Sequence, residues 1–521
     1  MQIALDQLPD DIDALKSLVA GQTAHNNRLV TRNEQLESKV IILQEQLNIA
    51  LAKRYSASSE KISPDQIRLF NEAEADSEAA AIPDVDDEVV IVGTHQRRKR
   101  GRRPLPEDLP RVDIIHEIPE CERRCDHDGR LLAEIGEVLC EQLDIIPAKI
   151  QVIRHIRKKY ACSCGQCIKL APLPAQPIPK SLASPGLLAH ITVSKYADAL
   201  PLYRQETILQ RIGVDIPRAT LANWMIQAGT LIQPLINLLH DRLVDYDIVQ
   251  MDETRVQVLK EAGRSAQSKS YLWLQRGGPP DQPVVLFHYD PGRGAGVAKR
   301  LLAGFKGYLQ TDGYDGYNDA VAVGDLTHVG CMAHARRKFS EAVKAQGPNK
   351  QCGRAHRGLA LIQKLYRIEK QARDLTPEGR HDHRQLHARP LLSELRTWLD
   401  TALPEVPPTS ATGKALNYLH NEWEKLIRYL EDGRVEIDNN AAENAIRPFV
   451  VGRKNWLFSD SVKGVKASAN LYSLIETAKA NGLEPYAYLR YLFTELPKAQ
   501  TVDAIEALLP GNLDEDQIRT A

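Results

Sequence analysis

The sequence contains no run of about 18 apolar residues, so no helix that spans a membrane is expected. Its first residues, MQIALDQLPDD, lack the basic segment and the following apolar segment of a secretory signal. We therefore expect a cytoplasmic protein, and the eight cysteines are expected to be reduced there.

The chain also has almost no net charge, because 67 basic residues nearly balance 68 acidic ones. This average hides a local asymmetry. Eight acidic residues and no basic one lie between Glu72 and Glu88, and six basic side chains follow between Arg97 and Arg103. The net charge of −1 is therefore uninformative about nucleic-acid binding. At 521 residues the chain is long enough for several domains of about 100 to 200 residues each.

A seven-residue repeat covers residues 11–51. One core position holds Ile12, Val19, Asn26, Asn33, Val40 and Leu47, and the other holds Leu15, Gln22, Leu29, Leu36, Leu43 and Ala50. This pattern predicts a coiled coil, and the two core asparagines favour a parallel dimer because such residues fix register and strand number. The alternative is an amphipathic helix that packs on its own chain.

Residues 55–110 are rich in Ser, Ala, Asp, Pro and Arg without periodicity, which is typical of a linker that buries too little apolar surface to fold. Its basic end, KRGRRPLP, is similar to the Arg-Gly-Arg-Pro arm that enters the DNA minor groove, with one additional arginine. The alternative is a basic run that only solubilises the linker. The candidate DNA contacts are Arg97, Arg98, Lys99, Arg100, Arg102 and Arg103.

Two cysteine clusters follow, CERRCDHDG and YACSCGQC, with strand-like sequence between them. Two thiol knuckles joined by a short sheet can supply the four ligands of a tetrahedral structural zinc site. We predict one structural Zn²⁺ here; the alternative is a small β-rich module with reduced cysteines. Cys331 stands apart from both clusters, like Cys140 and Cys352, and has no evident role in a metal site. The candidate ligands are Cys121, Cys125, Cys162, Cys164 and Cys167.

Residues 183–233 have a helical pattern interrupted by the turn VDIP, which predicts a helix-turn-helix. The apolar residues of the second helix, Leu221, Trp224 and Met225, would face inward. Arg218 and Asn223 lie on its other side and are candidate DNA contacts. A plain helical hairpin is the alternative.

Strand-like segments begin after residue 245. A strand with Asp252 in its middle is followed by a hairpin, an amphipathic helix and a strand that ends at Asp312. A buried aspartate is costly unless a positive charge compensates it. This order fits a ribonuclease H-like α/β fold, in which the first and fourth of these strands are neighbours.

A third carboxylate, Glu443, opens a predicted helix in DNNAAENAIRP. Together with the two aspartates it would make an oxygen-ligand site for two Mg²⁺ or Mn²⁺ ions that hold a phosphodiester. Arg447 lies one turn further on the same face, and Arg453 and Lys454 extend a basic track that is predicted to bind nucleic acid. For this stretch alone, the alternative is Asp438 as an ordinary N-cap and Glu443 as a surface charge.

Between the second and third carboxylates, VGCMAHARRKFSEA opens a mostly helical stretch that is too long for a loop. It predicts an inserted helical subdomain at about residues 340–430. Arg336 and Arg337, beside His334 and Lys338, are candidates for DNA contact or for assistance in proton transfer. The alternative is a solvated basic helix face.

At these motifs the sequence closely resembles transposases of the insertion-sequence-66 family. The resemblance covers nearly the whole chain and is carried by KRYSASSEK, EQLDIIPAKIQVIRHIRKKYAC, PKSLASPGLLAHITVSKYADALPLYRQE, QMDET, YLQTDGYDGY, VGCMAHARRKF and IDNNAAENAIRPFVVGRKNWLFS. It implies a catalytic domain of the DDE type, with Asp252, Asp312 and Glu443 as the three acids. One departure concerns the first cysteine knuckle, which is usually tighter in this family; here Cys125 is followed by His127, with Cys121 upstream.

The expected architecture is a multidomain α+β protein. Its parts are a leucine-zipper-like coiled coil (1–54), a linker with a basic arm (55–110), a zinc-finger-like module (111–172), a helix-turn-helix-like region (173–240), a ribonuclease H-like catalytic domain (241–465) and a C-terminal helical segment (466–521).

The expected activity is DNA transposition: binding of terminal inverted repeats, metal-dependent hydrolysis of a phosphodiester, and transfer of the freed 3′-hydroxyl to target DNA. Expected partners are DNA, a second copy or more through the coil, and small accessory proteins of the same element; nucleoid association is expected on DNA. Two other classes stay open, a metal-dependent nuclease without strand joining and a non-catalytic DNA-binding protein.

Overall fold

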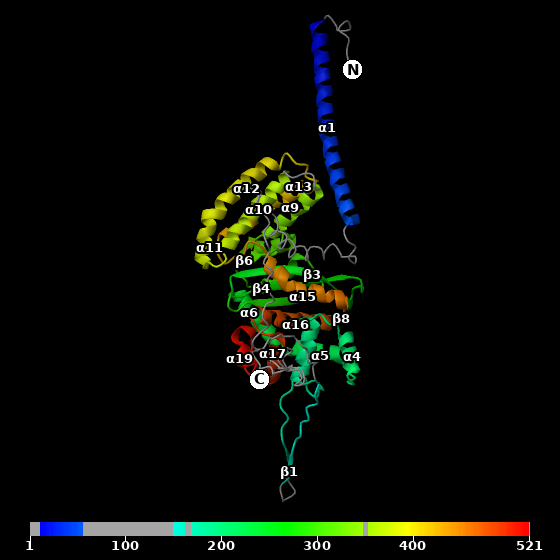
Figure 1. The fold of residues 1–521 in the computed structure, drawn as a ribbon, viewed down its shortest axis with the longest axis vertical. Helices are drawn as coiled ribbons and strands as arrows, with labels where there is room; N and C mark the ends of the chain where they lie inside the picture. The colour runs from blue at the N-terminus through cyan, green and yellow to red at the C-terminus, as the bar shows by residue number, and fades with distance from the viewer. Residues whose placement is uncertain (1–10, 56–149, 162–167, 347–352, 520–521) are drawn as a thin grey trace, which may run out of the picture. The chain divides into compact units, whose positions relative to one another are not determined.

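The computed structural model describes residues 11–55, 150–161, 168–346 and 353–519 (Figure 1). The chain divides into two compact units, Ala81–Leu173 and the remainder, Met1–Ala80 with Pro174–Ala521. The predicted basic arm and zinc ligands lie outside the described residues, so both stay predictions. These residues are Arg97, Arg98, Lys99, Arg100, Arg102, Arg103, Cys121, Cys125, Cys162, Cys164 and Cys167.

The smaller unit contains a two-stranded antiparallel ribbon. Strand β1 (Lys159–Ala161) pairs with β2 (Ile168–Leu170), so that Lys159 lies opposite Leu170. The second predicted cysteine knuckle falls in the sequence that connects these two strands.

The N-terminal repeat forms one helix, α1 (Ile12–Tyr55), as predicted. Its heptad residues are largely uncovered; Val19 is 61% exposed, Leu36 49% and Leu43 62%. The helix contacts the rest of the larger unit toward its C-terminal end. There, the Glu45 carboxylate accepts a hydrogen bond from the backbone N–H of Ala411 (2.8 Å). Packing on its own chain therefore leaves most of the apolar stripe of α1 exposed to solvent.

Four helices precede the central sheet: α3 (Pro185–Tyr196), α4 (Leu202–Arg211), α5 (Arg218–Leu231) and α6 (Gln233–Asp245). Helices α4 and α5 confirm the predicted helix pair and its turn. As expected from the spacing, Leu221, Trp224 and Met225 are buried. Arg218 and Asn223 are exposed on the other side of α5.

The sheet is mixed, with the strand order β5-β4-β3-β6-β7. The long first strand β3 pairs antiparallel with β4, which pairs antiparallel with β5, whereas β3, β6 and β7 run parallel. The hairpin and the pairing of the first and fourth strands, β3 and β6, follow the prediction, but β6 ends at Gln310, two residues before the predicted end at Asp312. The bounds are β3 (Ile248–Lys260), β4 (Lys269–Gly277), β5 (Val284–Asp290), β6 (Gly307–Gln310) and β7 (Leu326–Val329), with α7 (Ala295–Leu301) and α8 (Asn318–Val323) between the later strands.

A series of C-terminal helices follows, of which the first two lie along this sheet (Figure 1). They are α15 (Asn440–Trp456), α16 (Val462–Ala480), α17 (Pro485–Glu495), α18 (Val502–Glu506) and α19 (Glu515–Arg519), and the short strand β8 (Ser459–Ser461) pairs with the far end of β3. Helix α16 covers the edge strand β5. Its Ser473 and Thr477 hydroxyls accept hydrogen bonds from the backbone N–H groups of Phe287 (2.7 Å) and Val285 (3.0 Å). These backbone N–H groups of the edge strand, which could otherwise pair with another strand, thereby have hydrogen-bond partners.

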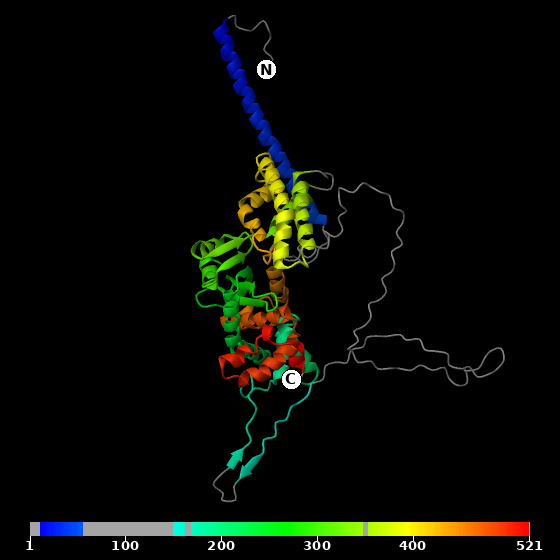
Figure 2. The same cartoon turned by 90° about the vertical axis from the view of Figure 1, so that its left-hand side faces the viewer.

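The stretch between β7 and α15 is helical, as expected for the insertion. Its helices α9 (Met332–Gln346), α10 (Arg354–Gln371), α11 (Pro377–His383), α12 (Arg389–Ala402), α13 (Ala411–Asn421) and α14 (Trp423–Leu426) form a bundle beyond the sheet (Figure 2). The bundle has an apolar core of its own, which includes Phe339, Leu365, Trp398 and Leu416. Within the described ranges, no helix combines the length and the apolar character needed to cross a bilayer.

Candidate active site

Asp252 and Asp312 are brought together by the register of two parallel strands. Gln250 of β3 pairs with Gln310 of β6, and each aspartate lies two residues further along. Side chains two residues apart point to the same face, and neighbouring strands are about 4.8 Å apart. The two carboxylates therefore emerge beside one another at the carboxyl end of this strand pair.

The same two glutamines hold the segment that precedes α15. The Gln250 side chain donates to that of Gln310 (2.8 Å), and Gln310 donates in turn to the carbonyl of Glu436 (2.7 Å). The Gln250 amide also approaches the carbonyl of Asp438 (3.5 Å). A chain segment far along the sequence is thereby fixed against the strands that carry the aspartates.

Asn439 completes this attachment. Its side-chain N–H donates to the carbonyl of Met251 in β3 (2.8 Å), and its backbone N–H donates to the Cys331 sulfur (3.2 Å). An asparagine before a helix usually caps that helix with its side chain. Here the side chain reaches across to the sheet instead, so the first turn of α15, which carries Glu443, is held against β3.

Burial and negative neighbours act together on Asp252. Burial raises its pKa most, and the charges of Glu253, Glu443 and Asp312 raise it further, to well above the ordinary value. The charges of Glu443 and Asp312 therefore lie near enough to Asp252 to disfavour its ionised form. An additional positive charge would stabilise their ionised forms.

Glu443 is only 8% exposed, although it lies in the first turn of its helix. Burial raises its pKa, interactions with His334 and Arg337 lower it, and the charges of Asp438 and Asp312 raise it. The nearest ion-pair distances are 3.7 Å from His334 Nδ1 to Oε1 and 3.6 Å from Arg337 Nη2 to Oε2. Glu443 is thus no surface charge; it is a buried carboxylate whose two oxygens face His334 and Arg337, and Asp312 lies near enough to raise its pKa.

Glu253 is an acidic neighbour that the sequence analysis does not single out. It follows Asp252 directly, so strand alternation turns it to the opposite face. There its carboxylate accepts hydrogen bonds from Arg293 (2.7 Å) and from the Tyr317 hydroxyl (2.5 Å). These partners lower the pKa of Glu253, but burial and the charge of Asp312 raise it more, so Glu253 belongs to the same group of interacting acids.

The donor set fits a divalent cation. Asp252, Asp312 and Glu443 offer carboxylate oxygens, the hard ligands that Mg²⁺ and Mn²⁺ prefer. The raised pKa of Asp252 indicates a deficit of positive charge at this position. A bound cation would remove that deficit.

The two predicted DNA contacts in α9 lie at the edge of this site. Arg337 is only 14% exposed and pairs with Glu443. The Arg336 guanidinium lies 5.1 Å from the centre of the Tyr366 ring. Contact of either residue with DNA stays a prediction.

The predicted basic track follows α15 away from the acids. Arg447 is half-buried one turn after Glu443, and Lys454 is exposed. Arg453 donates to the Thr254 hydroxyl of β3 (3.3 Å). The track therefore begins beside Glu443 and runs along β3, and its contact with nucleic acid stays a prediction.

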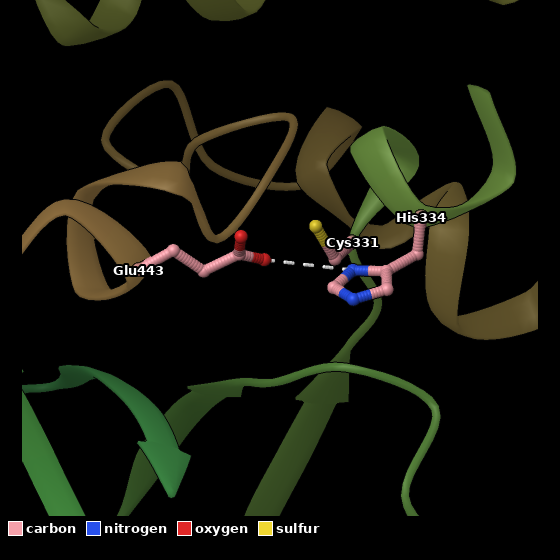
Figure 3. A group of neighbouring side chains, drawn as sticks. All are labelled: Cys331, His334 and Glu443. Carbon is pink, nitrogen blue, oxygen red and sulfur yellow. Dashed lines mark ion pairs between the residues drawn. The ribbon is translucent and has the colours of Figure 1, made fainter. Parts of the chain in front are cut away.

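Cys331 and His334 are brought to the site by β7 and α9. Cys331 follows β7 and is fully buried, and burial followed by the charges of Glu443 and Asp438 raises its pKa well above the ordinary value. Its sulfur, the His334 imidazole and the Glu443 carboxylate point toward one another (Figure 3). The sequence offers one sign of this cluster, the Cys-x-x-His spacing of Cys331 and His334. That spacing does not indicate that Glu443, more than a hundred residues away, is their neighbour.

Four family models match the chain. Residues 180–467 match the model described as "Transposase IS66 family", and 473–510 match "IS66 C-terminal element". Residues 122–165 match "zinc-finger binding domain of transposase IS66", and 42–114 match "Transposase C of IS166 homeodomain".

Relatives from Sinorhizobium fredii (strain NBRC 101917 / NGR234) are similar over nearly their full length. The protein y4qI is 32% identical over 549 residues, covering 99% of this chain and 100% of the relative. The protein y4jD is 34% identical over 541 residues, with 100% of both chains covered. Both are named only as uncharacterized proteins. The first family model spans more than half of the sequence, and the chain therefore belongs to the IS66 family of transposases.

Proposed function

We propose that this protein is a DDE-type transposase that binds the terminal inverted repeats of its element, hydrolyses a phosphodiester there and joins the freed 3′-hydroxyl to target DNA. The observation that carries the proposal is the environment shared by three acids from distant parts of the chain. Asp252 lies in β3, Asp312 follows β6 and Glu443 opens α15, and the charges of the other two raise the pKa of Asp252.

We also propose that the catalytic domain is ribonuclease H-like. This is supported by the strand order β5-β4-β3-β6-β7, with an antiparallel hairpin on one side of β3 and parallel strands on the other. One acid in the middle of the first strand and another just after the fourth strand agree with that proposal.

Asp252, Asp312 and Glu443 would hold two Mg²⁺ or Mn²⁺ ions. When bound, such a pair supplies activation of the attacking oxygen and stabilisation of the leaving oxygen in an in-line displacement. The contribution of the chain is to orient these carboxylates through Gln250, Gln310 and Asn439. Because hydrolysis and joining are both displacements at phosphorus, one site can serve both.

The remaining parts of the chain would bind and pair the DNA. Exposed Arg218 and Asn223 on α5 and the basic track of α15 are the proposed DNA contacts among the described residues. The match to a zinc-finger model supports one structural Zn²⁺ in residues 122–165. The exposed heptad stripe of α1 supports a homodimer that brings two element ends together.

Strand transfer tests the proposal directly. Purified protein, a labelled duplex of the element end, a plasmid target and Mg²⁺ are combined, and wild type is compared with Glu443→Gln. We expect Glu443→Gln to bind the duplex normally and to lose joined product by at least about 100-fold, since even the loss of a group behind a metal ligand costs about 10- to 100-fold. Asp319→Asn, which neutralises an exposed carboxylate, is the matched control.

The other outcomes separate the alternatives. Cleavage without joining in wild type would favour a nuclease or a requirement for an accessory protein. Equal DNA binding with no chemistry in either protein would favour a non-catalytic DNA-binding role and would overturn the proposal.

A further inference from the structure

We propose that Cys331, His334 and Glu443 form a second metal site, selective for Zn²⁺ or another thiophilic divalent ion, and that its occupation inhibits the enzyme by withdrawing Glu443 from the catalytic acids. The metal binding is argued from these three side chains alone. The inhibition rests on the proposed function.

The geometry is close to that of a ligand set. The cysteine sulfur, an imidazole nitrogen and a carboxylate oxygen all lie within 4.8 Å of one another (Figure 3). His334 Nδ1 and Glu443 Oε1 are 3.7 Å apart. Zinc bonds of about 2.0–2.3 Å in a tetrahedron place the ligand atoms roughly 3.4–3.7 Å from one another. Small side-chain rotations would therefore complete the site.

Two of the three ligand atoms lack a conventional partner. His334 Nδ1 and Glu443 Oε1 are both buried, and neither has a hydrogen-bond partner among the described residues. Buried polar atoms in native proteins are usually satisfied, and an ion missing from the structure is one explanation for an exception. The other Glu443 oxygen, Oε2, faces Arg337 at 3.6 Å, so Oε1 is the oxygen available to an ion.

One contact of Cys331 supports a metal-bound thiolate, whereas burial and the charges of Glu443 and Asp438 disfavour a thiolate without an ion. The backbone N–H of Asn439 donates to its sulfur (3.2 Å), and such a donor stabilises negative charge on that sulfur. Its thiol is fully buried, which shields it from bulk solvent and from larger reagents. An ion that binds here must displace the thiol proton, as at other metal–thiolate sites.

The chemistry of the ligands decides which ion this site prefers. Thiolate and imidazole select borderline and soft ions such as Zn²⁺, whereas Mg²⁺ prefers sites made only of oxygen. Three protein ligands leave a fourth position for water, as in non-structural zinc sites. Glu443 belongs to both ligand sets, so we expect an ion bound by Cys331 and His334 to hold the carboxylate that the aspartates would share.

Metal binding at this site can be measured without DNA, through the absorption of bound cobalt. The full chain is titrated with Co²⁺, and thiolate-to-cobalt charge-transfer absorption is compared between wild type and Cys331→Ser. We expect Cys331→Ser to lose the signal of one ion, whereas Cys352→Ser, which removes a cysteine that is not among the three proposed ligands, keeps it. Equal absorption in all three proteins would overturn the proposal.

A second variant covers the case in which Cys331→Ser fails to fold. His334→Ala retains every cysteine, so we expect a weaker cobalt affinity, by at least about tenfold, with the charge-transfer band of the other cysteines unchanged. An unaltered titration in a folded His334→Ala protein would also contradict the site.

Inhibition is measured separately from binding. Strand transfer at fixed Mg²⁺ is titrated with Zn²⁺, and each protein is normalised to its own zinc-free activity. The midpoint of inhibition should shift upward by at least about tenfold in His334→Ala relative to wild type. An unshifted midpoint would overturn the inhibitory role. If wild type showed no strand transfer, the proposed function would fail, while the cobalt titration would still decide whether the site exists.

Discussion

Buried amides, rather than the acids themselves, determine how the carboxylates are arranged. Gln250, Gln310 and Asn439 are all buried, and each bonds across two segments that are distant in sequence. Arg276 of β4 donates a further hydrogen bond to the side-chain oxygen of Gln250, Oε1 (2.9 Å). An amide is neutral, so it can hold these elements together without adding to the repulsion among the acids.

Replacement of Asn439 tests this role. Asn439→Ala removes the donor to the Met251 carbonyl, and we expect a loss of about 1–3 kcal/mol in the free energy of unfolding because a buried acceptor is left unsatisfied. Strand transfer should fall more than DNA binding, since Glu443 loses its attachment to β3. Urea unfolding and the joining assay measure the two effects.

The control for this variant is Asn444→Ala, the same substitution at an exposed position of α15. It should change the free energy of unfolding by no more than about 0.5 kcal/mol. If the two variants were equally stable and equally active, the positioning role of Asn439 would be wrong.

At the scale of the elements, helix α1 is distinguished by its solvent-exposed apolar residues. Leu29 and Leu36 are each 49% exposed, and they occupy the same heptad position. Contacts such as that of Glu45 lie near the C-terminal end of the helix. A second copy of α1 would bury this stripe and would account for the heptad spacing.

We expect Leu36→Asp to weaken the dimer at least tenfold. Burial of one leucine contributes about 1.5–3 kcal/mol, a dimer loses two of them, and each 1.4 kcal/mol is about a factor of ten. Sedimentation equilibrium across a concentration range measures the dissociation constant. Thr31→Asp introduces the same charge off the heptad core and should leave the constant unchanged. Equal dissociation constants would show that α1 does not mediate dimerisation.

At the scale of the whole molecule, the acids reduce the stability of the metal-free protein. The folded chain binds a proton at Asp252 more tightly than the unfolded chain does, because the pKa of this residue is raised above its ordinary 3.8. The free energy of unfolding therefore decreases as pH rises from that ordinary value through the raised one. Glu443 contributes in the same direction.

Asp252→Asn should reverse part of this effect. Because asparagine cannot ionise, we expect the metal-free variant to melt at least about 2 °C higher than wild type at pH 8, with a smaller difference near pH 4. Added Mg²⁺ should raise the melting temperature of wild type but not of the variant. Calorimetry at both pH values measures this, with Asp319→Asn as the exposed control. A variant that melted lower than wild type at pH 8 without metal would contradict the electrostatic argument.

Much of the architecture follows from local patterns. The heptads predicted α1, the VDIP turn predicted α4 and α5, and apolar strand patterns predicted the order of β3 to β6. Asp252 was recognisable because a charge in the middle of an apolar strand needs compensation. The family membership of the chain agrees with the sequence motifs around Asp252.

The sequence by itself determined the elements, the family and the three candidate acids, because each depends on periodicity or on a motif within a short segment. Only the tertiary structure decided that Asn439 bonds to β3 rather than capping its own helix, that Arg293 and Tyr317 donate hydrogen bonds to Glu253, and that Cys331 lies beside Glu443. These contacts join residues tens to hundreds of positions apart, and their partners are set by strand register and helix packing. Local sequence patterns carry little information about such pairings, which is why the environment of the acids emerged only from the fold.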